Sequence, residues 1–120
     1  MPGADSWLGG WSLKDFKRRR QHKKERVKFG YSTQDWWSFD SYLAGVIASG
    51  LERFASEEAH GHPADLSWEE WQNYLNSISV VLRRWENDFW GLPVNEGLEL
   101  EKDLKEAMHK FADRFTSLWD

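Results

Sequence analysis

The chain has 120 residues, a formal net charge of −4 and no cysteine, so it fits one hydrophobic core and excludes disulfides, thiolate metal sites and cysteine nucleophiles. Its longest apolar run, residues 42–51, is too short for a membrane span of about 20 residues. The N-terminus also lacks the pattern of a secretory signal, so we expect no membrane partner and a cytoplasmic location.

The first 28 residues form a basic segment. They hold nine Lys or Arg against three Asp or Glu, a net charge of +6, whereas residues 29–120 sum to −10. Ser12 followed by Asp15 predicts a helix over about 13–28, which has too few apolar residues to bury a full stripe. This arm could bind nucleic acid, lie on the acidic body of its own or a neighbouring molecule in a homo-oligomer, or stay solvated. The cations of interest are Lys17, Arg18, Arg19, Arg20, Lys23 and Lys24.

Three amphipathic helices are predicted after the basic arm, over about 33–57, 68–89 and 96–118. Ser32 and Ser67 each precede an acidic residue by three positions, as expected of helix N-caps. The middle helix carries a seam with steps of three and four residues: Trp68, Trp71, Leu75, Ile78, Leu82, Trp85 and Phe89. Mutual burial of the three apolar stripes predicts an all-α fold, an antiparallel three-helix bundle with a basic N-terminal helix or arm. The domains expected are a basic arm (1–28) and an acidic helical bundle (29–120).

The flanking helices have their own expected core faces. In the helix over 33–57 the predicted stripe is Trp36, Phe39, Leu43, Val46, Ile47, Gly50, Leu51 and Phe54. Small residues beside this stripe would let a neighbouring helix approach closely: Ala44, Gly45, Ala48 and Ser49. In the last helix the predicted stripe is Leu100, Leu104, Met108, Phe111, Phe115 and Leu118. The nine tryptophans of the chain are expected mainly in this core, with a binding face as the alternative.

Few residues carry recognisable chemistry. The polar cluster in the loop after the second helix is Glu57, Glu58, His60, His62 and Asp65. Its His-x-His pair could approach one metal ion, but polar residues with Gly and Pro are what a helix–helix loop needs, so we predict a structural loop and no metal site. Asp40 is expected either on the exposed side or accepting a hydrogen bond from a tryptophan N–H or a loop amide, and His109 on the surface. Motifs for phosphate loops, serine nucleophiles and zinc knuckles are absent, so we predict no enzyme, catalytic residue or cofactor.

A larger pattern extends over about residues 20–90. A basic stretch leads into the run from Gly30 to Ala48, which follows Gly-aromatic-Ser-x-x-Asp-x-Trp; then come His60-Gly61-His62-Pro63 and Glu69-Glu70-Trp71. This arrangement resembles a group of small uncharacterised bacteriophage and prophage proteins, which often have an aromatic residue in place of His62. The resemblance implies a phage or prophage origin and no mechanism.

Three hypotheses of function follow. The first is a non-enzymatic phage accessory protein that binds a host or defence-system protein, as an anti-CRISPR-like or other anti-defence inhibitor. Its acidic residues would imitate nucleic-acid phosphates, with contacts from Glu57, Glu58, Glu69, Glu70, Glu99, Glu101 and Asp103. The second is a nucleic-acid-binding protein that uses the basic arm. The third is an oligomeric nucleotide sponge, in which Trp7, Trp11 and the basic arm hold the ligand.

Overall fold

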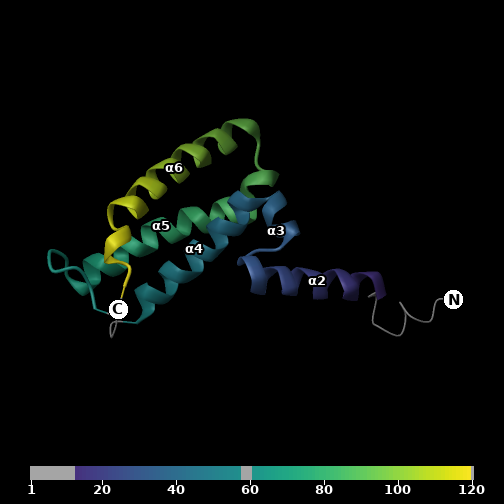
Figure 1. Ribbon diagram of the computed structural model, residues 1–120. Coiled ribbons are helices and arrows are strands. Elements are labelled where there is room, and N and C mark those ends of the chain that lie inside the picture. Colours follow the sequence, from purple (N-terminus) through teal and green to yellow (C-terminus); the bar gives the residue numbers. More distant parts are fainter. Residues whose placement is uncertain (1–12, 58–60, 120) are drawn as a thin grey trace. The chain divides into compact units, whose positions relative to one another are not determined.

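The computed structural model describes residues 13–57 and 61–119, and the elements in these ranges are all helical. Contacts divide the chain after Phe39 into two compact units, which are described separately. The basic unit contains α2 (Leu13–Phe29) and α3 (Thr33–Trp37). The acidic unit contains α4 (Phe39–Ser56), α5 (Trp68–Asp88) and α6 (Val94–Asp113), with the 3₁₀ turns η2 (Phe89–Gly91) and η3 (Phe115–Ser117) (Figure 1). The predicted all-α bundle is confirmed.

The boundary between the units lies later in the chain than the one drawn from charge. Residues 29–39 group with the basic helix, because the turn after α2 folds α3 back onto it. Ser12, Trp7 and Trp11 lie outside the described residues. No helix in the described parts of the chain is long and apolar enough to cross a membrane.

The middle helix of the acidic unit, α5, supplies most of the core. Its central seam residues are buried as predicted: Trp71, Leu75, Ile78, Leu82 and Trp85. The terminal seam residues Trp68 and Phe89 are only partly buried against this cluster. At the start of α5 the Ser67 hydroxyl accepts from the Glu70 amide at 3.1 Å, while a Glu70 carboxylate oxygen accepts from the Ser67 amide at 3.0 Å. The predicted N-cap is thus a complete capping box.

The core face of α4 is made of small residues. Its buried positions are Ala44, Gly45, Ala48, Leu51 and Ala55, whereas Leu43 and Val46 of the predicted stripe are 39% and 52% exposed. The predicted stripe is therefore confirmed only in part for α4: Leu51 is buried, Ile47 and Phe54 pack partly on the core, and Leu43 and Val46 do not belong to it. Small side chains let the α4 backbone approach α5 closely, and dispersion contacts with the large α5 residues then fill the interface.

Side-chain hydrogen bonds fix α4 on α5, among them two bonds from Arg83 to the Glu52 carboxylate. The Gln72 side-chain amide donates to the Ala55 carbonyl at 2.8 Å. At the other end of α4, the Trp85 indole N–H donates to an Asp40 carboxylate oxygen at 2.9 Å. Asp40 is exposed and also accepts from a tryptophan N–H, so both expectations are confirmed together, and the buried indole N–H has its partner.

The helix predicted over 33–57 is divided in two. Ser38 leaves the helical conformation (φ −128°, ψ 57°), and its amide donates to the Asp35 carbonyl three residues back, which ends α3. Neither Trp36 nor Trp37 is buried. A stripe that starts at Trp36 therefore has no continuous core to follow, and α4 begins independently at Phe39.

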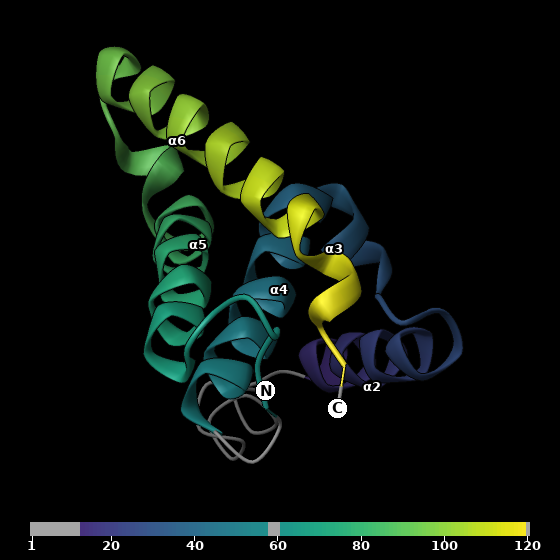
Figure 2. The ribbon, with the colours of Figure 1, turned by 90° about the vertical axis from the view of Figure 1, so that its left-hand side faces the viewer.

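The last helix runs antiparallel to α5 (Figures 1 and 2). It begins at Val94, after Pro93, and ends at Asp113, so the predicted end at 118 is wrong because a 3₁₀ turn replaces the last helical turn. Its stripe is confirmed in part: Leu100 is buried, Leu104, Phe111 and Leu118 pack partly on the core, and Met108 and Phe115 are exposed. The expected surface position of His109 is confirmed.

The tryptophans serve two purposes. Trp71 and Trp85 are buried and Trp68 is partly buried, as expected of core rings. Four others are exposed: Trp36, Trp37, Trp90 and Trp119. The expectation of a tryptophan core thus holds for three of the seven tryptophans that the structure describes.

The core of α5 predicts a stability difference between two positions on that helix. Leu82 is 1% exposed and Val80 is 59% exposed. Leu82→Ala should lower the free energy of unfolding by about 3 kcal/mol, because it removes buried methyl groups and leaves a cavity. The control Val80→Ala should change it by no more than about 0.5 kcal/mol. Urea unfolding followed by circular dichroism measures both, and equal losses would contradict this core assignment.

Candidate functional site

The turn between α2 and α3 is held by an ion pair with two hydrogen bonds. Arg26 donates from Nε and Nη2 to the two carboxylate oxygens of Asp35, each at 2.7 Å. Asp35 also accepts from the Ser32 amide at 2.9 Å, while the Ser32 hydroxyl accepts from the Asp35 amide at 3.1 Å. The Ser32–Asp35 cap predicted from the sequence is therefore confirmed, and Arg26 extends it across the turn.

This arrangement changes the acidity of Asp35. The hydrogen bonds from Arg26 lower the pKa of the Asp35 carboxyl far below its ordinary value, and they outweigh the opposing effect of burial. The Ser32 amide and hydroxyl lower this pKa further. Asp35 therefore stays ionised and keeps its ion pair at every pH near neutrality.

A second acid is used inside the same turn. The Glu25 carboxylate accepts from the Thr33 amide at 3.0 Å and from the Thr33 hydroxyl. Gly30 adopts φ +86°, a left-handed conformation that glycine takes without steric cost, so the chain can reverse directly after α2. The carboxylates of Glu25 and Asp35 are thus both engaged in hydrogen bonds that hold α3 against α2.

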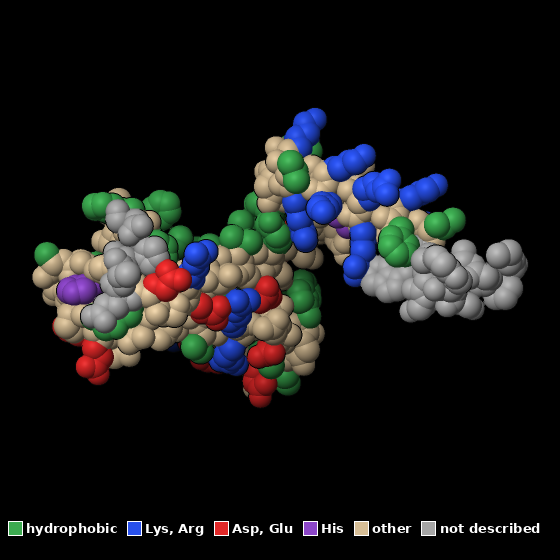
Figure 3. Space-filling model, turned by 90° about the horizontal axis from the view of Figure 1, so that it is seen from below, with side chains coloured by type: hydrophobic (Ala, Val, Ile, Leu, Met, Phe, Trp, Pro, Cys, Tyr) green, Lys and Arg blue, Asp and Glu red, His purple; other side chains and the backbone are tan. Residues whose placement is uncertain are grey.

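The predicted basic residues all lie on α2, which has no buried residue. Each of the six is exposed: Lys17, Arg18, Arg19, Arg20, Lys23 and Lys24. Within the described ranges, Lys17, Arg18, Arg20, Lys23 and Lys24 form no ion pair. Figure 3 shows Lys and Arg side chains along this helix. The helix therefore presents a dense positive charge, and these five cations have no ion-pair partner among the described residues.

The basic residues border a groove between α2 and α3. One part of it has a volume of about 610 Å³ and is lined by Arg18, His22, Thr33, Gln34, Trp37 and Ser38. The adjoining part has a volume of about 410 Å³ and is lined by Arg19, His22, Lys23, Arg26 and Gln34. The two parts share His22 and Gln34, and we call them together the α2–α3 groove. One wall is cationic, and the other carries the exposed Trp37 ring.

A separate groove of the basic unit has a different character. It has a volume of about 250 Å³ and is lined by Glu25, Phe29, Tyr31, Thr33 and Trp36. The Phe29 and Tyr31 ring centroids are 6.1 Å apart. We call this the aromatic groove; its charged lining residue is a carboxylate rather than a cation.

The acidic residues predicted to bind a partner lie in two groups. Glu57, Glu69 and Glu70 lie near the α4–α5 connection, Glu99, Glu101 and Asp103 lie on the first half of α6, and Glu58 falls outside the described residues. The two groups are at opposite ends of α5, which is 21 residues or about 30 Å long. Glu70 is also used in the capping box, and Glu101 approaches Lys105 at 3.7 Å. The structure therefore places these residues in two groups that are separated along the helices.

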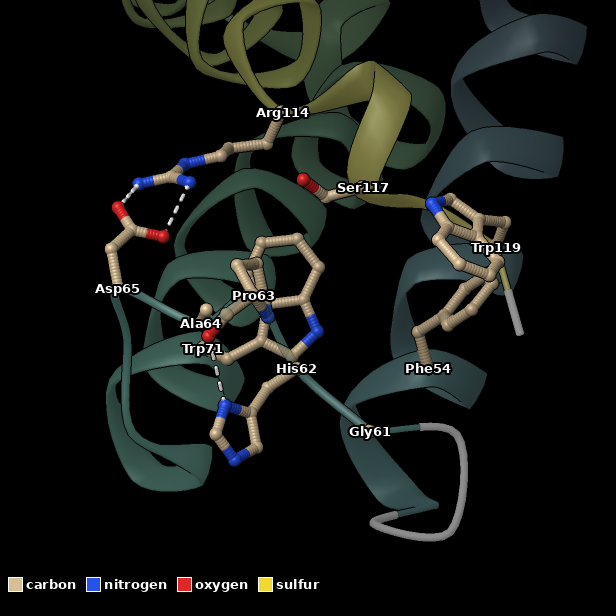
Figure 4. A pocket seen from close by; sticks show the side chains of 10 residues that line it. All are labelled: Phe54, Gly61, His62, Pro63, Ala64, Asp65, Trp71, Arg114, Ser117 and Trp119. Atoms are coloured by element: carbon tan, nitrogen blue, oxygen red, sulfur yellow. Dashed lines mark hydrogen bonds and ion pairs between the residues drawn. The ribbon is translucent and has the colours of Figure 1, made fainter.

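A hollow lies in the acidic unit beside the loop that follows α4 (Figure 4). Its volume is about 420 Å³, and Phe54, Trp71 and Trp119 give it aromatic walls. Arg114 donates to both carboxylate oxygens of Asp65, at 3.0 and 2.7 Å. These bonds lower the pKa of Asp65 and raise that of Arg114. Asp65 therefore connects the loop to the end of α6.

The loop cluster considered for metal binding is described only in part. His60 and Glu58 lie outside the described residues, and Asp65 is bound to Arg114. The His62 Nδ1 atom lies 3.0 Å from the Pro63 carbonyl oxygen. Over residues 13–57 and 61–119, no group of three His, Cys, Asp or Glu side chains could hold a metal ion.

Sequence reasoning identified the cations of the basic unit but missed His22, Gln34 and Trp37. One signal could have found Trp37. Successive side chains on a helix point about 100° apart, so the adjacent pair Trp36–Trp37 cannot place both rings at the centre of one buried stripe. At least one exposed indole beside the basic helix was therefore to be expected.

The Arg26–Asp35 pair predicts an unusual titration. By NMR, the Asp35 carboxyl should titrate well below its ordinary pKa of 3.8. Because the folded-state pKa is lower than the unfolded one, the pair stabilises the turn above the ordinary pKa, and this contribution is lost as the pH falls through the folded-state value. Arg26→Gln should raise the pKa of Asp35 toward 3.8, while the control Arg53→Gln in the acidic unit should not. An unchanged titration in Arg26→Gln would contradict the assigned cause.

Comparison with protein-family models, with curated proteins and with solved structures finds no match for this chain. The interpretation of the basic unit therefore depends on its own geometry and charge.

Proposed function

We propose that the protein is a non-enzymatic nucleic-acid-binding protein whose α2 helix contacts the phosphate backbone. One observation carries the proposal: six exposed cations lie within two turns of one helix, and two acids of the same unit, Glu25 and Asp35, are committed to the α2–α3 turn. Neutralising phosphates releases counterions, so such a cluster gains affinity from each contact.

The placement of the cations favours a nucleic acid over a flat acidic protein surface. Residues 17–20 are four consecutive cations, and at about 100° per residue their side chains spread around most of the helix. A rigid protein face would contact only the cations on one side of the helix. A chain of phosphates, or the two walls of a groove, can contact several sides at once.

The hypothesis of a phage protein that inhibits bacterial defence through an acidic face stays a prediction. Its proposed contacts form two groups separated along the helices of the acidic unit, and no groove or cluster described above joins them. The nucleotide-sponge hypothesis also stays a prediction, because Trp7 and Trp11 fall outside the described residues.

The salt dependence of binding tests the proposal. Fluorescence anisotropy of a labelled oligonucleotide should show affinity that falls steeply with salt. The triple variant Arg20→Gln/Lys23→Gln/Lys24→Gln should reduce the slope of log affinity against log salt by about 2–3, since each lost phosphate contact removes about 0.7–0.9. At fixed low salt, its affinity should fall by roughly tenfold or more.

A control variant removes the same charge from the acidic unit: Arg84→Gln/Lys102→Gln/Lys105→Gln. It tests whether location or net charge matters, and its slope should match that of the unchanged protein. Equal weakening of the two triple variants, or no binding by the unchanged protein, would refute the proposal.

A further inference from the structure

We infer that the α2–α3 groove binds single-stranded nucleic acid, with phosphates on the α2 cations and one unpaired base stacked on Trp37. This inference rests on the proposed function and adds to it the strand class and the residue that selects it. The juxtaposition that carries it is a highly exposed indole on α3 facing a cationic wall of α2 across one groove.

The Trp37 ring is the proposed stacking surface. It stands at the end of α3 and is 79% exposed. An indole carries a large apolar surface, which gains free energy when another ring covers it. A nucleobase is a flat ring that can cover an indole face, and such stacking tolerates any base because every base has a π-face.

The charge around the Trp37 ring favours a phosphate. Arg18 and His22 line the same part of the groove as Trp37, and Lys23 and Arg19 line the adjoining part. No carboxylate side chain lines either part. A phosphate in this groove therefore meets only neutral or positive lining residues, while its base can reach the opposite wall. Aromatic rings beside a positively charged track are the usual means of binding single strands.

Base pairing decides whether a nucleic acid can use the Trp37 ring. In a duplex the faces of the bases are stacked on one another, and only the base edges and the backbone are open to a protein. An exposed indole can stack on a base only where that base is unpaired. The groove therefore favours single-stranded DNA or RNA, whereas the α2 cations alone would bind either form.

Gln34 adds a polar group at the centre of the site. Its side chain lines both parts of the α2–α3 groove. An amide offers two N–H donors and one acceptor, so it can bond to the exposed edge of an unpaired base held beside Trp37. This contact requires no particular base.

The neighbouring tryptophan provides an internal control. Trp36 is on the same short helix and is also exposed, but it lines the aromatic groove together with Glu25. The carboxylate there repels phosphate, and no cation lines that groove. The inference therefore assigns stacking to Trp37 and not to Trp36. Trp90 of the acidic unit is a second control, because it has the same exposed fraction as Trp37, 79%.

The experiment compares the full chain with Trp37→Ala, Trp37→Phe, Trp36→Ala and Trp90→Ala. Anisotropy would measure affinity for a mixed-sequence single-stranded DNA, the matching RNA and the duplex, at one low salt concentration. Trp37→Ala should lower single-strand affinity by roughly fivefold to a hundredfold, the range expected for one lost base stack, and leave duplex affinity unchanged. Trp37→Phe should retain most of the single-strand affinity, because a ring remains.

The salt slope separates stacking from charge. Trp37→Ala should keep the slope of the unchanged protein, since it removes no phosphate contact, and circular dichroism should show unchanged helix content. The inference is overturned if Trp37→Ala binds single strands as well as Trp90→Ala or Trp36→Ala does, or if it weakens duplex binding equally. In those cases the proposed function survives as long as the triple α2 variant still loses salt-dependent affinity. Failure of the unchanged protein to bind any nucleic acid would refute both.

Discussion

The bidentate Arg26–Asp35 ion pair is the interaction on which the candidate site depends. Alone, α3 has only five residues, too few to pay the free energy of helix nucleation in water. Asp35 stabilises the short helix by forming the capping box with Ser32. It also fixes the position of α3 by its ion pair with Arg26 on α2. The position of Trp37 relative to the basic helix follows from these bonds, so a turn that looks structural also shapes the α2–α3 groove.

The same bonds decide which charges remain available. The basic unit uses Glu25 and Asp35 inside the turn, which leaves most of the α2 cations without an ion pair in the described ranges. In the acidic unit the situation is reversed. Arg83 donates to Glu52 and Glu86, which raises its pKa, and Arg114 donates to Asp65. Arg83 and Arg114 are thus used in internal ion pairs, while acids such as Glu69 and Glu99 stay exposed. Each unit thus shows the solvent mainly one sign of charge.

The sequence predicts a residue's environment well where burial or capping alone determines it. Three features could be predicted from the sequence: the α5 seam, the two serine caps and the Asp40–tryptophan bond. Each depends on spacing along one helix or on one polar group that needs a partner. The core face of α4 was misread since large apolar residues dominate a periodicity argument, whereas Ala44 and Ala48 pack against α5 through close backbone approach. The groove was missed for a different reason. Arg26 and Asp35 are nine positions apart across a turn, and no periodicity relates them.

The exposed tryptophans show why exposure alone does not define a site. Trp37 and Trp90 are exposed to the same degree, 79%, yet their surroundings differ. Trp90 contacts the Phe89 ring edge to face, with centroids 5.3 Å apart, so part of its aromatic surface already has a partner. Trp37 faces a groove whose other wall carries Arg18 and His22. An aromatic ring with open faces beside cations can bind a ligand that has both a flat ring and a negative charge. An unpaired nucleotide has both, in its base and its phosphate.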